Sequence, residues 1–381
     1  MSKLFKFLSA FLSLILLIWV CAPSIGATDI RQGEISVSAK AAVLIDTSDD
    51  SILYSKNADS RLPMASTTKI MTALIALEYG NLDRSYVIPD AAVGIEGSSI
   101  YLVHGEKLTL RELIYALMLE SANDAAQAIA IIIAGSVEAF ADIMNRRAEE
   151  LGLENTHFTN PHGLDHEEHY TTAYELARLA SFALKNEAFR EIVSTNKKTV
   201  PFNNGEGTRV LVNHNKMLRT YDGAIGVKTG FTKRCGRCLV SAAQRDGLTL
   251  VAVTLNAPDD WRDHTAMLDW GFDNFVRISL ADAETFKLPL PVCGASEPRV
   301  MCTNTQAIAV TLPRGHATIS CVVEAPRFLF APIARDDTVG KLIYYCNGRI
   351  IDESALCTTA AISPQNIKKG LWSRIMALFD F

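Results

Sequence analysis

The chain has 381 residues, of which 49% are hydrophobic and 21% charged, and its formal net charge is -5. This composition suits one large or two ordinary domains with filled cores, and it excludes disordered and collagen-like proteins. A net negative charge without a clustered basic face argues against a nucleic-acid partner. The sequence contains no phosphate loop and no dinucleotide fingerprint. We therefore expect no cofactor, and we expect side chains of the protein to carry any catalytic chemistry.

Residues 1–27 have the layout of a secretory signal peptide. Lys3 and Lys6 precede an apolar run over residues 7–20, and small residues follow at 26–27. An uncleaved anchor is the alternative, but the run is short for a bilayer span of roughly 20 residues. We therefore expect an exported protein.

The chain contains eight cysteines, five of them in its last quarter. Export permits disulfides, but spacing alone does not give their connectivity. Buried free thiols that pack as small hydrophobes are the alternative.

Residues 36–55 predict two strands around a turn at 47–50, and residues 64–79 predict a helix. Thr109 and Glu112 form a capping box that begins a second helix, which residues 121–124 interrupt before a third. Further helices are predicted at 136–151, 172–194 and 261–275. Strands are predicted at 208–212, 223–229, 238–245 and 248–256. This order suggests one mixed sheet with helices on its faces.

After about residue 285 the pattern changes to short β-rich runs separated by Pro and Gly, which predicts a small all-β domain. The last residues, 365–381, predict an amphipathic interfacial helix too short to span a bilayer. Its basic start and apolar face are formed by Lys368, Lys369 and Arg374, and by Leu371, Trp372, Ile375, Met376, Leu378 and Phe379. A terminal helix docked on the protein itself is the alternative.

Ser66 and Lys69 lie three residues apart at the head of a helical run, so their side chains share one face and can form a nucleophile and its base. A first-turn N–H has no partner within the helix, so that of Ser66 could donate to an oxyanion. The alternative is an ordinary helix start with a surface lysine. Ser194 and Lys197 repeat the spacing, but no apolar helical run follows Lys197. A Ser-x-x-Lys match by itself is therefore weak evidence for a catalytic pair.

Two further motifs follow. Ser121 and Asn123, in "SAN", lie where two helices meet and could face a cleft, although an N-cap of the second helix explains them equally well. "GVKTGFT" at 226–232 is rarer: on a strand, Lys228 supplies charge, Thr229 a hydroxyl for a carboxylate, and Gly230 lets substrate backbone approach.

In this order the three motifs resemble the signature set of penicillin-binding proteins and β-lactamases, with Ala122 where the pattern has aspartate. The stretches "LMLESANDAA", "NPHGLDHEEHYTTAYELA", "NKMLRTYDGAIGVKTGFT", "GRCLVSAA" and "APIARDDTVGKL" resemble the serine D-Ala-D-Ala carboxypeptidases, the low-molecular-mass penicillin-binding proteins. The resemblance implies an α+β fold: a β-lactamase/transpeptidase-like domain, with an antiparallel sheet and helices on its faces, followed by a small all-β domain. The implied boundaries are a signal peptide at 1–27, the catalytic domain at 28–284, a β-sandwich domain at 285–364, and the membrane-associating helix at 365–381.

The resemblance also implies roles. Ser66 would attack the carbonyl between the two terminal D-alanines of a peptidoglycan stem peptide, and Lys69 would be its neutral base. Ser121 would relay a proton to the leaving amine, Asn123 would hold the substrate amide, and Lys228 with Thr229 would bind the terminal carboxylate. Next to Gly230, the N–H of Phe231 would complete the oxyanion hole with that of Ser66.

The implied partners are peptidoglycan stem peptides, β-lactams as inhibitors, and the outer face of the cytoplasmic membrane through the terminal helix. Alternatives are a D,D-endopeptidase acting on cross-links and a non-catalytic peptidoglycan-binding scaffold. A β-lactamase is disfavoured because no Glu-x-x-Leu-Asn segment lies between "SAN" and "KTG".

Several residues fit less clearly. Cys235 and Cys238 form "CGRC", but a thioredoxin-like motif opens a helix, whereas this one leads into a strand. Arg262 could correspond to a carboxylate-binding arginine of relatives, although its spacing differs. A zinc site at His162, His166 and His169 is disfavoured because their segment reads as a loop; we expect no metal, and we expect Asn160, His162 and Asp165 to brace the loop under the active site.

Overall fold

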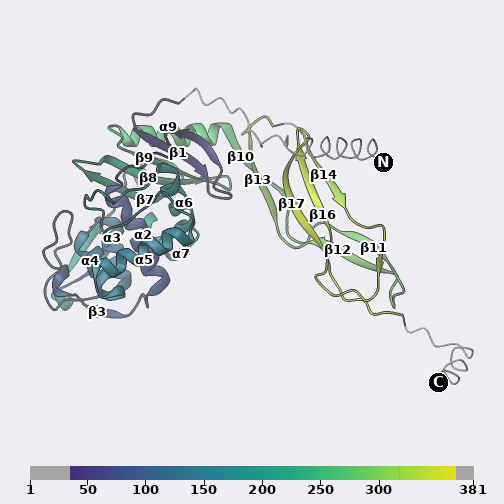
Figure 1. Cartoon of the computed structure of the whole chain (residues 1–381), viewed down its shortest axis with the longest axis horizontal. Coiled ribbons are helices and arrows are strands. Elements are labelled where there is room, and N and C mark those ends of the chain that lie inside the picture. Colours follow the sequence, from purple (N-terminus) through teal and green to yellow (C-terminus); the bar gives the residue numbers. More distant parts are fainter. Residues whose placement is uncertain (1–34, 317, 366–381) are drawn as a thin grey trace, which may run out of the picture.

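The computed structural model describes residues 35–316 and 318–365. The predicted signal peptide and the predicted terminal helix after Gln365 lie outside the described residues. Figure 1 shows an α+β part built around one sheet and, beyond β10, a part built of strands. The predicted α+β class with a following all-β part is confirmed.

The sheet of the first part has the strand order β2-β1-β9-β8-β7. Its strands are β1 (Ala41–Asp46), β2 (Ile52–Lys56), β7 (Ala224–Thr232), β8 (Gly236–Arg245) and β9 (Leu248–Leu255). Every neighbouring pair is antiparallel, so our interpretation of a mixed sheet from the element order was wrong. Consecutive strands joined by short turns can pair only antiparallel, and β1 then adds to β9. This order leaves β7, which carries the "KTG" motif, at the edge.

Helices cover both faces of this sheet (Figure 1). On one face Leu44 and Leu250 pack with Phe272 of α9 (Asp260–Asn274). On the other, Val43 and Val251 belong to the core that contains α2 (Lys69–Tyr79) and α6 (Ala173–Leu184). Burial on both sides explains why β1 is apolar from Ala41 to Ile45, before the buried Asp46 at its end, instead of alternating with polar residues.

Most of the remaining helices and hairpins lie on the α2 side, whereas Met217 of α8 (Met217–Thr220) packs in the core on the α9 side. The elements are α3 (Leu110–Leu119), α4 (Asn123–Ala134), α5 (Val137–Glu150), α7 (Glu187–Ser194), α8 (Met217–Thr220), the 3-10 turns η1 (Ala65–Thr68), η2 (Asp90–Ala92) and η3 (Asn203–Gly205), and the hairpins β3 (Ser85–Val87) with β4 (Lys107–Thr109) and β5 (Lys197–Phe202) with β6 (Gly207–Val212). The capping box of Thr109 and Glu112 is confirmed. The helix predicted over 172–194 is two helices, because the Asn186 side chain caps α7 by accepting from two backbone N–H groups.

The second part holds a two-stranded sheet and a six-stranded sheet of order β14-β16-β17-β12-β11-β15. Its strands are β10 (Phe275–Ala281), β11 (Leu288–Cys293), β12 (Arg299–Asn304), β13 (Ile308–Pro313), β14 (Ile319–Glu324), β15 (Leu329–Phe330), β16 (Thr338–Cys346) and β17 (Arg349–Thr358). Six cysteines in the described part of the chain are free thiols: Cys235, Cys238, Cys293, Cys302, Cys321 and Cys357.

No single helix in the described ranges is long and apolar enough to cross a membrane, whereas α4 and α5 together satisfy that criterion as a pair bent by 83°.

Candidate active site

Ser66 and Lys69 are brought together where η1 meets α2. The helix that we predicted from residue 64 begins as a 3-10 turn, with Ser66 in that turn and Lys69 as the first residue of the α-helix. In a 3-10 turn, side chains three residues apart eclipse each other. Lys69 Nζ accordingly lies 3.0 Å from Ser66 Oγ.

The amine of Lys69 has two further partners, both of them acceptors. Nζ lies 2.7 Å from Asn123 Oδ1 and 2.5 Å from the carbonyl oxygen of His162. A neutral amine has two N–H donors and one lone pair. Donation to Asn123 and His162 leaves the lone pair for the Ser66 hydroxyl, which is the arrangement that a general base needs.

Burial favours this neutral form. The Lys69 side chain is fully buried, and its pKa is held well below the ordinary lysine value, first by burial and then by the charge of Lys228, against a smaller opposing effect of Asp124. Burial also lowers the pKa of Lys228 to about 7.

The second Ser-x-x-Lys match lacks this geometry. Ser194 ends α7, and its hydroxyl donates to the Glu191 carbonyl, whereas Lys197 begins β5. The two side chains therefore do not share a helical face.

The "SAN" motif lies between α3 and α4. Ser121 is buried and adopts a φ of 60°, which is uncommon for a residue other than glycine. The N-cap of α4 is Ala122, which makes no side-chain cap, so the capping explanation for this motif was wrong. Asn123 instead accepts from Lys69 and donates from Nδ2 to the Glu96 carbonyl at 2.6 Å.

The "KTG" motif lies on β7, directly beside the turn that holds Ser66. Lys228 is buried, and its Nζ donates to the Thr229 carbonyl at 3.0 Å. A Cβ on Gly230 would lie 3.1 Å from Ser66 N, a tight contact, so glycine favours the close approach of strand and turn here. The hydrogen bonds of η1 begin at Thr67, whose N–H donates to Met64, so the N–H of Ser66 precedes them. Phe231 follows with an exposed side chain.

The loop at 160–165 braces this corner, as we predicted. Asn160 Oδ1 accepts from the N–H groups of His162 and Gly163, and its Nδ2 donates to Leu164. Asp165 Oδ1 accepts from the Thr232 hydroxyl at the end of β7. His162 contributes its backbone carbonyl, a role that no pattern of side chains in the sequence indicates.

A chain segment from far outside the motifs also supports Asn123. Asp124 is fully buried and accepts from the Ser99 hydroxyl at 2.5 Å and the Leu102 N–H at 3.0 Å. The Asn123 N–H donates to the Ser98 carbonyl in the same loop. An acidic residue in the first turn of a helix usually indicates only a favourable helix dipole, so nothing in the local pattern marks this anchor.

A family model described as D-alanyl-D-alanine carboxypeptidase, peptidase S11, matches residues 28–259. The chain belongs to this family. D-alanyl-D-alanine carboxypeptidase DacF of Bacillus subtilis is 32% identical over 334 residues, which cover 85% of this chain and 86% of the relative.

Solved structures agree. Penicillin-binding protein 5 of Haemophilus influenzae superposes with a TM-score of 0.73 at 27% identity, covering 86% of this chain and 98% of its own. The Streptomyces K15 DD-transpeptidase superposes with a TM-score of 0.60 at 36% identity, covering 62% of this chain and 98% of its own.

Two further candidates from the sequence of this S11 peptidase do not join the site. Arg262 lies in the first turn of α9 with a largely exposed side chain, and its ion pair in the described structure is with Asp259 at 4.0 Å. Burial raises the pKa of the Cys235 and Cys238 thiols to about 11 and about 12. Thiols of such high pKa are poor nucleophiles, which argues against redox chemistry at "CGRC".

The histidines of the 162–169 segment are engaged in hydrogen bonds. His169 receives the Thr159 N–H at Nδ1, and its Nε2 lies 2.7 Å from Thr68 Oγ1. Over the residues that the structure describes, no three His, Cys, Asp or Glu side chains are grouped to hold a metal ion.

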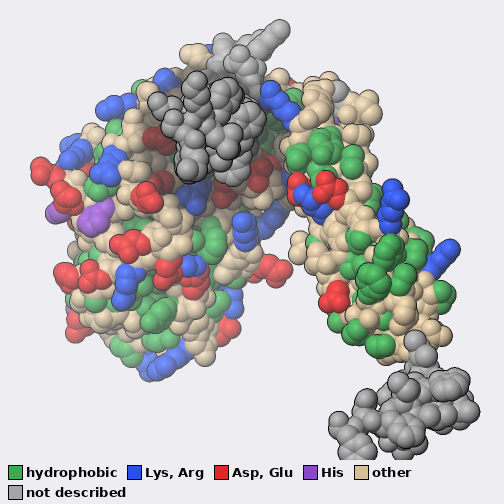
Figure 2. Space-filling view, turned by 45° about the vertical axis from the view of Figure 1, so that its right-hand side comes forward, with side chains coloured by type: hydrophobic (Ala, Val, Ile, Leu, Met, Phe, Trp, Pro, Cys, Tyr) green, Lys and Arg blue, Asp and Glu red, His purple; other side chains and the backbone are tan. Residues whose placement is uncertain are grey.

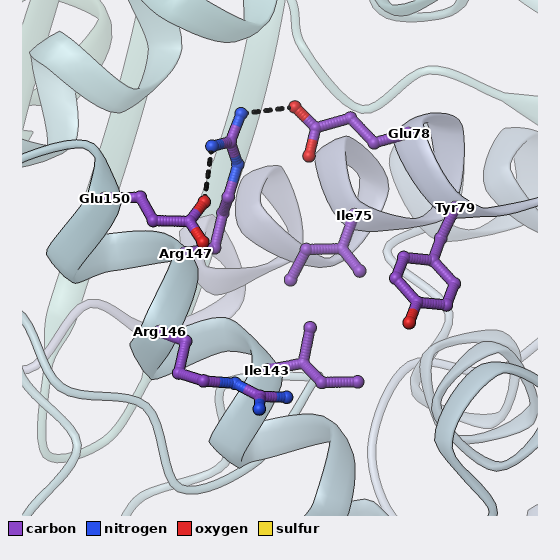
Figure 3. A pocket seen from close by; sticks show the side chains of 7 residues that line it. All are labelled: Ile75, Glu78, Tyr79, Ile143, Arg146, Arg147 and Glu150. Atoms are coloured by element: carbon purple, nitrogen blue, oxygen red, sulfur yellow. Dashed lines mark hydrogen bonds and ion pairs between the residues drawn. The ribbon is translucent and has the colours of Figure 1, made fainter.

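A separate pocket lies at the other end of α2 in this carboxypeptidase (Figure 3). Its volume is about 550 Å³, and Arg147 is paired there with Glu78 and with Glu150, each at 2.7 Å. The length of α2, about 15 Å, separates Tyr79 in this pocket from Lys69, so the pocket is not part of the site around Ser66 and Lys69.

Proposed function

We propose that the chain removes the terminal D-alanine from peptidoglycan stem pentapeptides through an acyl-enzyme on Ser66. The observation that carries the proposal is the set of three partners around Lys69 Nζ: two acceptors for its N–H groups and the hydroxyl of Ser66 at 3.0 Å. A binding scaffold would not need a buried amine against a hydroxyl, because burial of an unused amine costs free energy.

In the acylation step the lone pair of Lys69 takes the Ser66 proton while Oγ forms a bond to the carbonyl carbon of the penultimate D-alanine. Backbone N–H groups of Ser66 and Phe231 stabilise the resulting oxyanion. The C–N bond to the last D-alanine then breaks, and the proton held by Lys69 passes through the Ser121 hydroxyl to the leaving amine.

Substrate binding rests on the edge strand. Because β7 pairs with β8 alone among the described strands, backbone groups of residues 228–231 on its other edge can pair with an extended peptide. The ammonium of Lys228 and the hydroxyl of Thr229 bind the terminal carboxylate, while Asn123 donates to or accepts from the substrate amide. A Cβ added at Gly230 would lie 3.1 Å from Ser66 N, so this part of the strand lies directly beside Ser66.

Water then hydrolyses the ester, with Lys69 again accepting a proton. A β-lactam presents a similar amide and carboxylate, and its ring opening keeps the leaving amine attached to the acyl group. We therefore infer that β-lactams acylate Ser66 and remain bound longer than the peptide.

The proposal includes a location. A signal-like segment at 1–27 and an amphipathic segment at 365–381 support an exported protein held at the outer face of the cytoplasmic membrane.

The test is D-alanine release from a pentapeptide ending in D-Ala-D-Ala by the wild type, the Ser66→Ala variant and the matched Ser194→Ala variant. The proposal requires release by the wild type and Ser194→Ala, and a loss of at least about 10³-fold in Ser66→Ala. Release by Ser66→Ala at the wild-type rate would overturn it. A cross-linked dimer of stem peptides, used as a second substrate, separates endopeptidase activity from carboxypeptidase activity.

A further inference from the structure

The outer face of β11 carries apolar side chains where polar ones are usual. Alternate residues of this strand, such as Leu290 and Val292, pack in the core of the β part. The residues between them, Pro289, Pro291 and Cys293, are exposed. An antiparallel sheet with one solvated face normally presents polar residues on that face.

Neighbouring strands extend the same surface. Met301 lies opposite Pro289, and Phe330 lies opposite Cys293, with 39% and 70% of their areas exposed. Phe328 packs edge-on against Phe330, with ring centroids 5.3 Å apart, and is 46% exposed. We call the following six residues the apolar face: Pro289, Pro291, Cys293, Met301, Phe328 and Phe330. Figure 2 shows hydrophobic side chains gathered over this part of the molecule.

Basic residues accompany the apolar face. Arg299 lies opposite Pro291, and Arg327 adjoins Phe328 in sequence. Both are exposed, and neither forms an ion pair within the described ranges. Contiguous exposed apolar surface bordered by polar residues marks an interaction site.

The end of the described chain lies beside this surface. The Gln365 N–H donates to the Gly294 carbonyl at 2.8 Å, and Gly294 follows Cys293 of the apolar face. The described chain therefore ends beside the apolar face. The sequence that follows, residues 366–381, holds Lys368, Lys369 and Arg374 next to apolar residues such as Trp372.

We propose that the apolar face rests on the surface of an anionic lipid bilayer, the same kind of surface that the proposed function assigns to the amphipathic segment at 365–381. This inference rests on the membrane association in the proposed function. Exposed aromatic rings lower their free energy when they enter the headgroup region of a bilayer. Each arginine near the surface adds electrostatic attraction to anionic lipids. A single weak anchor gives only marginal, reversible binding, so a second contact makes the attachment stable.

A second copy of the chain is a poorer occupant. In a two-fold interface the same patch meets itself, which would bring Arg299 and Arg327 of one copy toward those of the other. An anionic lipid surface has the complementary charge.

The test measures partition of the chain, residues 28–381, onto vesicles of phosphatidylethanolamine and phosphatidylglycerol. Phe328→Ser with Phe330→Ser should lower the partition coefficient about tenfold or more, because two aromatic contacts are lost. The matched control is Ile350→Ser. This side chain is 54% exposed and lies on β17, near the end of the strand that pairs with Tyr345 of β16 and not with β12. It should leave partition unchanged. A chain ending at Gln365 should show weaker partition that falls again with the Ser substitutions.

Several results would overturn the inference. Unchanged partition of the double-Ser variant would show that the face does not contact lipid. Increased partition would show that residues 366–381 normally cover the face and are released. A dimer in sedimentation equilibrium that the Ser substitutions dissociate would assign the face to a second copy.

D-alanine release, measured on the same samples, keeps the two proposals apart. If D-alanine is released at the full rate but the Ser substitutions leave the partition coefficient unchanged, only the lipid contact is contradicted. Lipid-dependent partition without release contradicts the proposed reaction alone. A wild-type chain that does not bind vesicles at all overturns the membrane association and the lipid contact together.

Discussion

Gly163 packs against the carbonyl oxygen of Ala65, so closely that a Cβ on this glycine would overlap that oxygen. Its φ of 87° is also a conformation that side chains rarely adopt. This contact joins the loop at 160–165 to Ala65, the residue before Ser66. The position of Ser66 therefore depends on a residue 97 positions away in sequence, 163 minus 66.

Gly163→Ala should lower both stability and acylation, because the new methyl group must push the loop away from η1. We expect a loss of about 2–4 kcal/mol of unfolding free energy and about 10²-fold slower acylation by a fluorescent penicillin. Gly105→Ala is the matched control, since its φ is 75° but nothing lies within 4 Å of the added Cβ. Equal losses in the two variants would attribute the effect to backbone strain alone.

Lys228 predicts a pH dependence of substrate binding. Its pKa is lowered to about 7 by burial, so its positive charge is present below that pH and is lost as the pH rises through it. The KM for a pentapeptide should therefore rise above about pH 7, by up to about tenfold per pH unit. Lys228→Arg keeps its charge and should flatten this rise. A wild-type KM that stays constant from about pH 6 to about pH 9 would contradict the role of Lys228.

Asn123 predicts a second pH effect through its bond to Lys69. Asn123→Asp would place a carboxylate beside the amine, which raises the pKa of Lys69 and favours its protonated, non-basic form. Acylation at neutral pH should fall about 10²-fold and recover as the pH rises, whereas Asn123→Ala should be slow without that recovery. Stopped-flow acylation across the pH range checks this. Parallel pH profiles of the two variants would show that the charge at this position does not act on Lys69.

Loss of the buried ion pair between Arg209 and Glu106 should lower the stability of the fold strongly. Glu106 is fully buried; burial raises its pKa, but bonds from Arg209 and from the N–H groups of Val103 and Asn203 outweigh this and leave the pKa below its ordinary value. Arg209 Nε also donates to the Ile100 carbonyl at 2.7 Å, within the loop that Asp124 anchors.

Arg209→Ala should cost about 3–5 kcal/mol, because it leaves a buried carboxylate unpaired. With an unfolding entropy of about 2.1 cal/mol/K per residue, this cost corresponds to a fall in Tm of about 4–6 °C in calorimetry for a chain of 381 residues. Adding Glu106→Gln should recover part of the loss. A cost below about 1 kcal/mol would show that the pair behaves like a surface ion pair.

The sequence predicted the parts of this site that depend on local spacing. Ser66 with Lys69, and Lys228 with Gly230, each lie on one continuous turn or strand, so the pattern of a few residues is enough to relate their side chains. The Ser194 match failed for the same local reason, since a helix ends between its two residues.

The parts that it did not predict depend on packing between distant segments. The His162 carbonyl reaches Lys69 from 93 positions away, and the Asp124 carboxylate holds a loop 22 to 25 positions earlier. Strand β5 was missed because Pro201 and two lysines are unusual in a strand; pairing with β6 stabilises it nonetheless. Packing between distant segments also explains why the Asn123 side chain binds Lys69 and does not cap α4.

If Ser66 is the nucleophile and Lys69 its base, penicillin must form a covalent adduct on Ser66. Mass spectrometry of the chain after incubation with penicillin detects that adduct in the wild type, Ser66→Ala and Lys69→Met. We expect one penicilloyl adduct on the peptide that contains Ser66 in the wild type, none in Ser66→Ala, and adduct formation at least about 10³-fold slower in Lys69→Met. An adduct on another residue, or one that survives in Ser66→Ala, would contradict both roles.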